Sequence, residues 1–153
     1  MKRSFFSFIF FLLIVHPLIT FSQGTNFDIG TLPKEWTALT KTKNGLIIYN
    51  TCDGGNTLIS IVGDKSYEIL LHGQQEDYGF VIESVNKNKD NLITIKTKDK
   101  DTGELEIFHF KWIDKNKGLG TWTYSFATNL IFVHAGKEKY YPKVNEDCTH
   151  FWD

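Results

Sequence analysis

The sequence predicts an all-β fold, an antiparallel up-and-down meander of about eight strands closed or nearly closed into a barrel, with one short N-terminal helix. Strand-like runs recur at a spacing of roughly 8–12 residues with turn signals between them, which is typical of a sandwich or barrel. The connections are short and polar, which favours antiparallel pairing of neighbouring strands. A barrel is preferred over an open sandwich because closure removes exposed strand edges.

Residues 1–22 have the pattern of a secretory signal peptide. Two basic residues precede an apolar run over residues 5–15, and Thr20 and Ser22 are small residues at the −3 and −1 positions of a cut after residue 22. The run is shorter than the ~20 apolar residues of a membrane-spanning helix. We therefore expect export to the periplasm or the cell exterior, with residues 23–153 forming a single β-barrel domain.

Residues 33–42 are predicted to form the short helix, because Pro33 suits a first helical turn and Trp36 and Leu39 are spaced to face inward together. The rest of the chain is interpreted as strands joined by turns. The predicted strands cover residues 46–50, 57–62, 67–71, 78–85, 92–98, 104–113, 119–126 and 130–133, with a short piece around Tyr140.

Alternation is clearest in the second half of the chain. Ile93 and Ile95 share one face of their run, whereas Lys96 points to the other. Trp122 and Tyr124 likewise alternate with threonines. These are the patterns of half-buried antiparallel strands with a solvated outer face.

Cys52 and Cys148 are the two cysteines of the chain, and they are predicted to form a disulfide. Exported chains meet an oxidising compartment, and two cysteines allow one intramolecular pairing. The alternative is a thiol nucleophile at Cys52 served by one of the histidines that follow the signal peptide, His72, His109, His134 or His150. No catalytic cysteine signature surrounds Cys52, so the structural interpretation is preferred.

The remaining polar clusters do not predict catalysis, a metal site or a cofactor. The acidic turn at residues 99–104 and the Asn/Asp-rich turn at residues 86–90 lack the distant bidentate glutamate of a calcium loop, so ordinary hairpin turns are preferred and a calcium site is the minor alternative. Glu104 and Glu106 lie on one strand face, whereas glycosidase carboxylates flank a bond from opposite sides. The histidines are scattered singly, and phosphate-binding and dinucleotide motifs are absent. The protein is thus predicted not to be an enzyme.

The net charge also limits the partners. The full chain carries a formal charge of −1, and loss of Lys2 and Arg3 with the signal peptide makes it −3. Nucleic-acid binding requires clustered cations, so a nucleic-acid partner is not expected.

Two groups of aromatic residues are candidates for binding. Inward-facing rings in the second half would line the barrel, where they form either a packed core, which is preferred, or the walls of an apolar ligand cavity. These rings are Phe108, Phe110, Trp112, Trp122 and Tyr124. The second group flanks Cys148 and is predicted to contact a protein partner, because aromatic anchors dominate protein interfaces. It comprises Tyr140, Tyr141, Phe151 and Trp152. The alternative, equally compatible with the sequence, is that these rings dock on the barrel itself.

Tyr49, Cys52, Gly54 or Gly55 and the β-run that follows resemble the periplasmic inhibitors of C-type lysozymes, which are small exported β-barrels with a similarly placed cysteine pair. The Ser-Gly-x-x-Tyr inhibitory loop of that family does not occur here, so no inhibitory residue is carried over. In outline the chain is also similar to the lipocalins and other calycins, although Gly120-Thr121-Trp122 lies late in the chain and their Gly-x-Trp signature lies in the first strand.

These observations predict an exported, non-enzymatic binding protein. The preferred hypothesis is a protein-binding inhibitor or immunity protein, whose partner is a cell-envelope protein or a secreted toxin or hydrolase. The alternative is a lipocalin-like carrier of a small apolar ligand.

Overall fold

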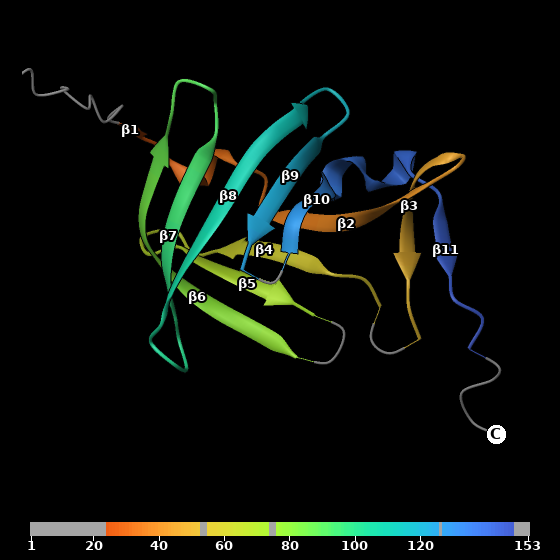
Figure 1. Cartoon of the computed structure of the whole chain (residues 1–153), viewed down its shortest axis with the longest axis horizontal. Coiled ribbons are helices and arrows are strands. Elements are labelled where there is room, and N and C mark those ends of the chain that lie inside the picture. The colour runs from red at the N-terminus through yellow and green to blue at the C-terminus, as the bar shows by residue number, and fades with distance from the viewer. Residues whose placement is uncertain (1–23, 53–54, 74–75, 126, 149–153) are drawn as a thin grey trace, which may run out of the picture.

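The computed structural model describes residues 24–52, 55–73, 76–125 and 127–148, and it arranges them almost entirely as β-strands (Figure 1). The predicted signal peptide lies outside the described residues. In chain order the elements are β1 (Thr25–Asn26), η1 (Ile29–Thr31), β2 (Glu35–Thr42), β3 (Gly45–Asn50), β4 (Leu58–Val62), β5 (Glu68–His72), β6 (Asp77–Lys87), β7 (Ile93–Asp99), β8 (Leu105–Asp114), β9 (Leu119–Tyr124), β10 (Ala127–His134), η2 (Ala135–Tyr140) and β11 (Lys143–Asn145), where η denotes a 3₁₀ helix.

Eight strands form a closed antiparallel barrel, as predicted. Strands β4 to β10 follow one another as a meander, each hydrogen-bonded to the next. Strand β2 closes the ring because it pairs with β4 on one side and β10 on the other; Trp36 lies opposite both Ile59 and His134. Among the described residues, no helix is both long and apolar enough to cross a membrane.

Three of the strands in the described part of the chain lie outside this ring. The second half of β2 continues past the barrel and pairs with β3 at Thr40–Thr42. Strand β11 then adds to β3 in parallel, so the two form an extension beside the barrel (Figure 1). The short β1 pairs with the end of β6.

The predicted helix at residues 33–42 is wrong, because this segment is the closing strand β2. Trp36 and Leu39 are both buried, as predicted, but on opposite faces of a strand. Trp36 points into the barrel core, whereas Leu39 packs outside the wall with Ile48 and Val133. A strand buried on both faces loses its alternation, and a spacing of three between apolar residues then imitates a helix.

The short strand predicted around Tyr140 is also misplaced. Tyr140 ends the 3₁₀ helix η2, and the strand β11 begins three residues later at Lys143. The other helical element is the single turn η1, where the Asp28 carboxylate accepts a hydrogen bond from the backbone N–H of Gly30 at 2.9 Å. This is the N-cap arrangement that aspartate favours.

Aromatic rings fill the barrel interior. Phe108, Phe110 and Trp122 are fully buried, and the centre of the Trp36 ring lies 4.9 Å from that of Phe110. The Phe110 ring also approaches Gly120 so closely that a Cβ there would clash with a ring carbon. A side chain on Gly120 would therefore displace the ring, which shows how tightly this layer is packed.

The two central tryptophans differ in one respect. Trp36 Nε1 donates a hydrogen bond to the carbonyl oxygen of Pro33 at 2.8 Å. Trp122 Nε1 is buried, and within the described part of the chain it has no hydrogen-bond partner. A buried donor without an acceptor is destabilising.

We therefore expect Trp36→Phe to lower the free energy of unfolding by about 1–2 kcal/mol more than Trp122→Phe does. Both substitutions remove similar volume, but the first breaks a hydrogen bond and the second removes an unpaired donor. Urea denaturation of both variants measures the difference. An equal or larger loss for Trp122→Phe would contradict this account.

Candidate functional site

The C-terminal arm, residues 135–148, is the most distinctive feature outside the barrel. It leaves β10 at His134, forms η2 against β2, and then runs beside β3 as β11 (Figure 1). The arm ends at Cys148, which is bonded to Cys52 with a Cα–Cα distance of 5.6 Å. The predicted disulfide is thus confirmed, and it joins positions 96 residues apart in the sequence.

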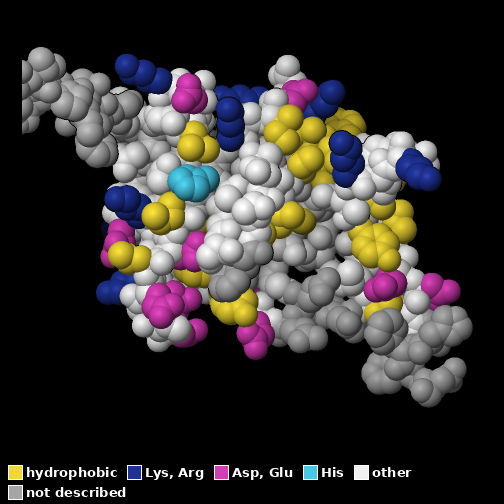
Figure 2. Space-filling model, viewed as in Figure 1, with side chains coloured by type: hydrophobic (Ala, Val, Ile, Leu, Met, Phe, Trp, Pro, Cys, Tyr) yellow, Lys and Arg dark blue, Asp and Glu magenta, His cyan; other side chains and the backbone are white. Residues whose placement is uncertain are grey.

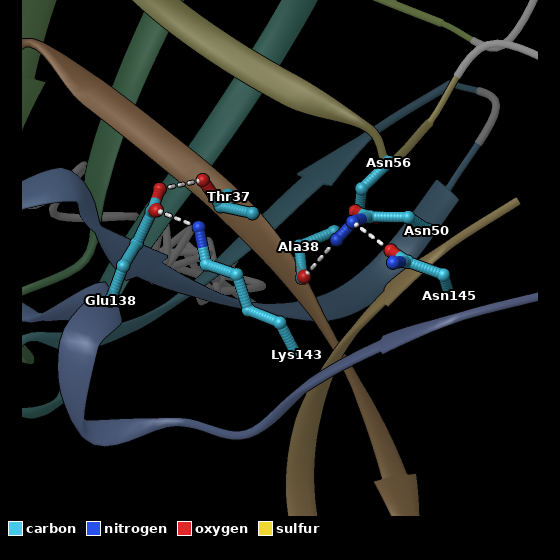
Figure 3. A network of polar contacts seen from close by, with 7 residues as sticks. All are labelled: Thr37, Ala38, Asn50, Asn56, Glu138, Lys143 and Asn145. Carbon is cyan, nitrogen blue, oxygen red and sulfur yellow. Dashed lines mark hydrogen bonds and ion pairs between the residues drawn. The ribbon is translucent and has the colours of Figure 1, made fainter.

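The first half of the arm is attached to the barrel by Glu138 (Figure 3). One carboxylate oxygen accepts a hydrogen bond from the hydroxyl of Thr37, a buried residue on the outer face of β2. The other lies 3.2 Å from Lys143 Nζ, at the start of β11. Glu138 therefore holds η2 on the barrel wall and fixes the turn between η2 and β11.

The second half of the arm is attached to β3 and to the segment that follows it. Ile48 N donates to the carbonyl of Pro142 at 2.8 Å. Asn50 Nδ2 donates to Asn145 Oδ1 at 2.8 Å, as Figure 3 shows. The Cys52 backbone N–H then donates to a carboxylate oxygen of Glu146 at 3.0 Å. Hydrogen bonds and a covalent bond thus hold the arm over most of its length.

A small second core lies between the arm and the barrel wall. Leu39, Ile48, Leu119 and Val133 are its buried members, and Tyr141 packs against them. The Tyr141 hydroxyl donates to the carbonyl of Lys117 at 3.3 Å. Burial raises the pKa of Tyr141, and the negative charge of Asp114 raises it further. Tyr141 therefore takes part in attaching the arm.

Tyr140, in contrast, faces solvent with 65% of its surface exposed. Lys137 and Lys139 place their ammonium groups 5.4 and 5.2 Å from the centre of its ring. A shallow groove of about 320 Å³ runs beside it. We call this region the Tyr140 surface; it consists of Asn116, Lys117, Lys137, Lys139 and Tyr140.

The extension formed by β3 and β11 also exposes apolar side chains. Val144 of β11 is 40% exposed. Figure 2 shows hydrophobic side chains over β3 and β11, with lysines at one end of this group and acidic side chains at the other. The extension thus presents an apolar strip between groups of opposite charge.

The other candidate residues lie elsewhere. Phe108, Phe110, Trp122 and Tyr124 are buried in the barrel, with the Phe108 and Tyr124 ring centres 5.4 Å apart. Trp112 is half-buried at one end of the barrel. Phe151 and Trp152 lie outside the described residues. Of the four residues predicted to bind a protein partner, the structure describes Tyr140 and Tyr141, and Tyr140 is the more exposed.

The residues that hold the arm carry no signal in the sequence. Glu138 and Thr37 are 101 positions apart, and no local pattern links them. Asn50 and Asn145 are 95 positions apart.

Among the described residues, no three His, Cys, Asp or Glu side chains gather as metal ligands would. Comparisons with protein-family models, curated proteins and solved structures found no match to this chain.

Reduction of the disulfide should destabilise the protein. The chain-entropy model gives up to about 4.7 kcal/mol for a closed loop of roughly 100 residues. The double variant Cys52→Ser/Cys148→Ser should therefore unfold at clearly lower urea concentration than the oxidised protein. Thiol titration of the unfolded, unreduced protein is the control and should find no free thiol. Unchanged stability of the double variant would contradict a stabilising role for the disulfide.

His134 should make the junction between the barrel and the arm sensitive to pH. The His134 ring packs beside Trp36, with 5.9 Å between the two ring centres. Its partial burial lowers the pKa of His134 below the usual 6.5, and the positive charge of Lys137 lowers this pKa further. The unfolded chain then binds a proton more readily than the folded chain. The stability gained from neutral His134 is complete above pH 6.5 and is lost as the pH falls towards the folded-state pKa.

Urea denaturation at pH 7.5 and pH 5 tests this effect. His134→Phe keeps a ring beside Trp36 but cannot titrate, so it should lose less stability between these values than the unmodified protein does. Other ionisable groups are common to both proteins and cancel in the comparison. Equal losses would show that His134 does not contribute.

Proposed function

We propose that this chain is an exported, non-enzymatic protein-binding module that uses the Tyr140 surface to hold a partner protein. The partner would be a cell-envelope protein or a secreted toxin or hydrolase, which makes the module an inhibitor or immunity protein. The observation that supports this most directly is the exposure of Tyr140 on an arm attached along most of its length.

Prior attachment of the arm favours tight binding. Association costs free energy when loops and side chains must be ordered at the interface. Here Glu138, the pairing of β11 with β3 and the disulfide already fix the backbone around Tyr140. Tyrosine adds a large contact area with few rotatable bonds, and it is among the residues that most often dominate interface energies.

The charge around Tyr140 indicates the character of the partner. Lys137 and Lys139 flank the ring, and Lys117 lines the adjoining groove. The carboxylate of Glu138 is turned towards Thr37 and Lys143. A partner with an acidic side chain beside an apolar contact would therefore complement this surface.

Export is part of the proposal and has two supports. Residues 1–22 have the pattern of a signal peptide, and disulfides such as Cys52–Cys148 persist in oxidising compartments. The resemblance to inhibitors of C-type lysozymes is compatible with such a role. Membership of that inhibitor family stays a prediction, because the chain lacks the inhibitory loop of the family and matches no family model.

Photo-crosslinking in cells that naturally produce the protein tests the proposal. With p-benzoylphenylalanine at position 140, we expect a discrete crosslinked partner in the envelope or secreted fraction. Position 78 is the matched control, since Tyr78 is also exposed but lies in the barrel strand β6. Once the partner is identified, Tyr140→Ala should weaken binding by about 30-fold, or roughly 2 kcal/mol, as for an interface hot spot.

The interface proposal fails if position 140 gives no crosslink, or if positions 140 and 78 crosslink equally. It also fails if Tyr140→Ala binds the identified partner as tightly as the unmodified protein. Thermal unfolding of Tyr140→Ala should match that of the unmodified protein, so that loss of binding is not loss of fold.

A further inference from the structure

A second pocket, which shares no lining residue with the Tyr140 surface, lies at one end of the barrel. An open pocket of about 730 Å³ is bounded by the segment after η1, the β6–β7 hairpin and the β8–β9 hairpin. In Figure 1 these two hairpins stand at the top of the barrel. The volume lies within the range of roughly 300–1,000 Å³ that is usual for small-molecule sites, and barrel mouths are frequent positions for them.

The inner part of this pocket is apolar. Leu32 and Ile93 contribute buried side chains, and the half-buried rings of Phe27 and Trp112 complete the lining. Trp112 lies 5.2 Å from both Trp36 and Phe110, measured between ring centres. The packed core therefore closes the pocket from below, and a ligand would rest on Trp112 without entering the barrel.

The rim of the pocket is positively charged. Lys87, Lys111 and Lys115 line it together with one carboxylate, Asp90. Within the part of the chain that the structure describes, none of the three lysines forms an ion pair. Lys87 Nζ lies 5.9 Å from the centre of the Phe27 ring, and Lys115 Nζ lies 5.7 Å from that of Trp112. Cationic groups thus stand directly beside apolar rings.

This local excess of cations contrasts with the chain as a whole, whose formal charge is −1. Several lysines that line one pocket raise the local concentration of anions there. The apolar lining adds a hydrophobic contribution that is proportional to the ligand area it covers. Together these two features select molecules that carry both an acidic group and an apolar body.

We infer that this pocket binds a small anionic amphiphile, a molecule with one acidic headgroup and a short aliphatic or aromatic body. The body packs on Phe27 and Trp112, and the headgroup lies among Lys87, Lys111 and Lys115. This function is separate from the proposed protein interface, because it uses none of the residues of the Tyr140 surface.

Decanoate is a suitable probe, with decyltrimethylammonium as its match of equal chain length and opposite charge. Decanoate should displace the fluorescent sulfonate 8-anilinonaphthalene-1-sulfonate from the protein, and decyltrimethylammonium should displace it far less. In NMR spectra, decanoate should shift the indole N–H signal of Trp112. No binding of decanoate at millimolar concentration, or equal binding of the cation, would overturn the inference.

Two triple variants separate a local from a global charge effect. Lys87→Gln/Lys111→Gln/Lys115→Gln should weaken decanoate binding by at least roughly tenfold, because charge-assisted contacts are lost. Lys41→Gln/Lys96→Gln/Lys98→Gln removes the same charge from exposed positions outside the pocket and should change binding little. Equal weakening in both variants would overturn the inference. Tyr140→Ala should leave decanoate binding intact, which keeps this test independent of the protein interface.

Discussion

The fold depends on the closure of the barrel by β2. This strand pairs with β4 through Glu35–Thr37, with β10 through Trp36–Leu39 and with β3 through Thr40–Thr42. Its inner face places Trp36 among the core rings, and its outer face supplies Thr37 and Leu39 to hold the C-terminal arm. Without β2, the strands β4 and β10 would be open edges, and the arm would lose its contacts with Thr37 and Leu39.

The same strand shows where sequence reasoning fails. The meander from β4 to β10 was predictable, because residues such as Ile93, Ile95, Trp122 and Tyr124 alternate with solvated neighbours. Alternation exists only where one face of a strand meets water. Strand β2 is covered on both sides, so its apolar residues follow no period of two and it was predicted to be a helix. The disulfide was predictable for a different reason, since two cysteines allow a single intramolecular pairing.

The candidate site was predictable only in part. Tyr140 was identified as an aromatic residue beside Cys148, and the structure places it in solvent. What makes the position suitable for binding is the attachment of the arm through Glu138, Thr37 and Lys143, and these contacts join distant positions. The pocket at the barrel end is likewise formed by residues from different segments of the chain. Its three lysines come from β6, from β8 and from the turn after β8, and none is notable in the sequence alone.

A filled barrel also determines where function can reside. Rings such as Trp36, Phe110 and Trp122 fill the interior, so both proposed sites lie at a barrel end or on segments outside the wall. The β8–β9 hairpin contributes to both proposed sites, because Lys115 borders the pocket and the Lys117 carbonyl accepts the hydrogen bond of Tyr141. The Asp114 carboxylate holds this turn by accepting backbone N–H bonds from Asn116 and Lys117, at 2.9 and 3.1 Å. This turn thus carries one lysine of the proposed anion pocket, Lys115, and also supports the C-terminal arm at Tyr141.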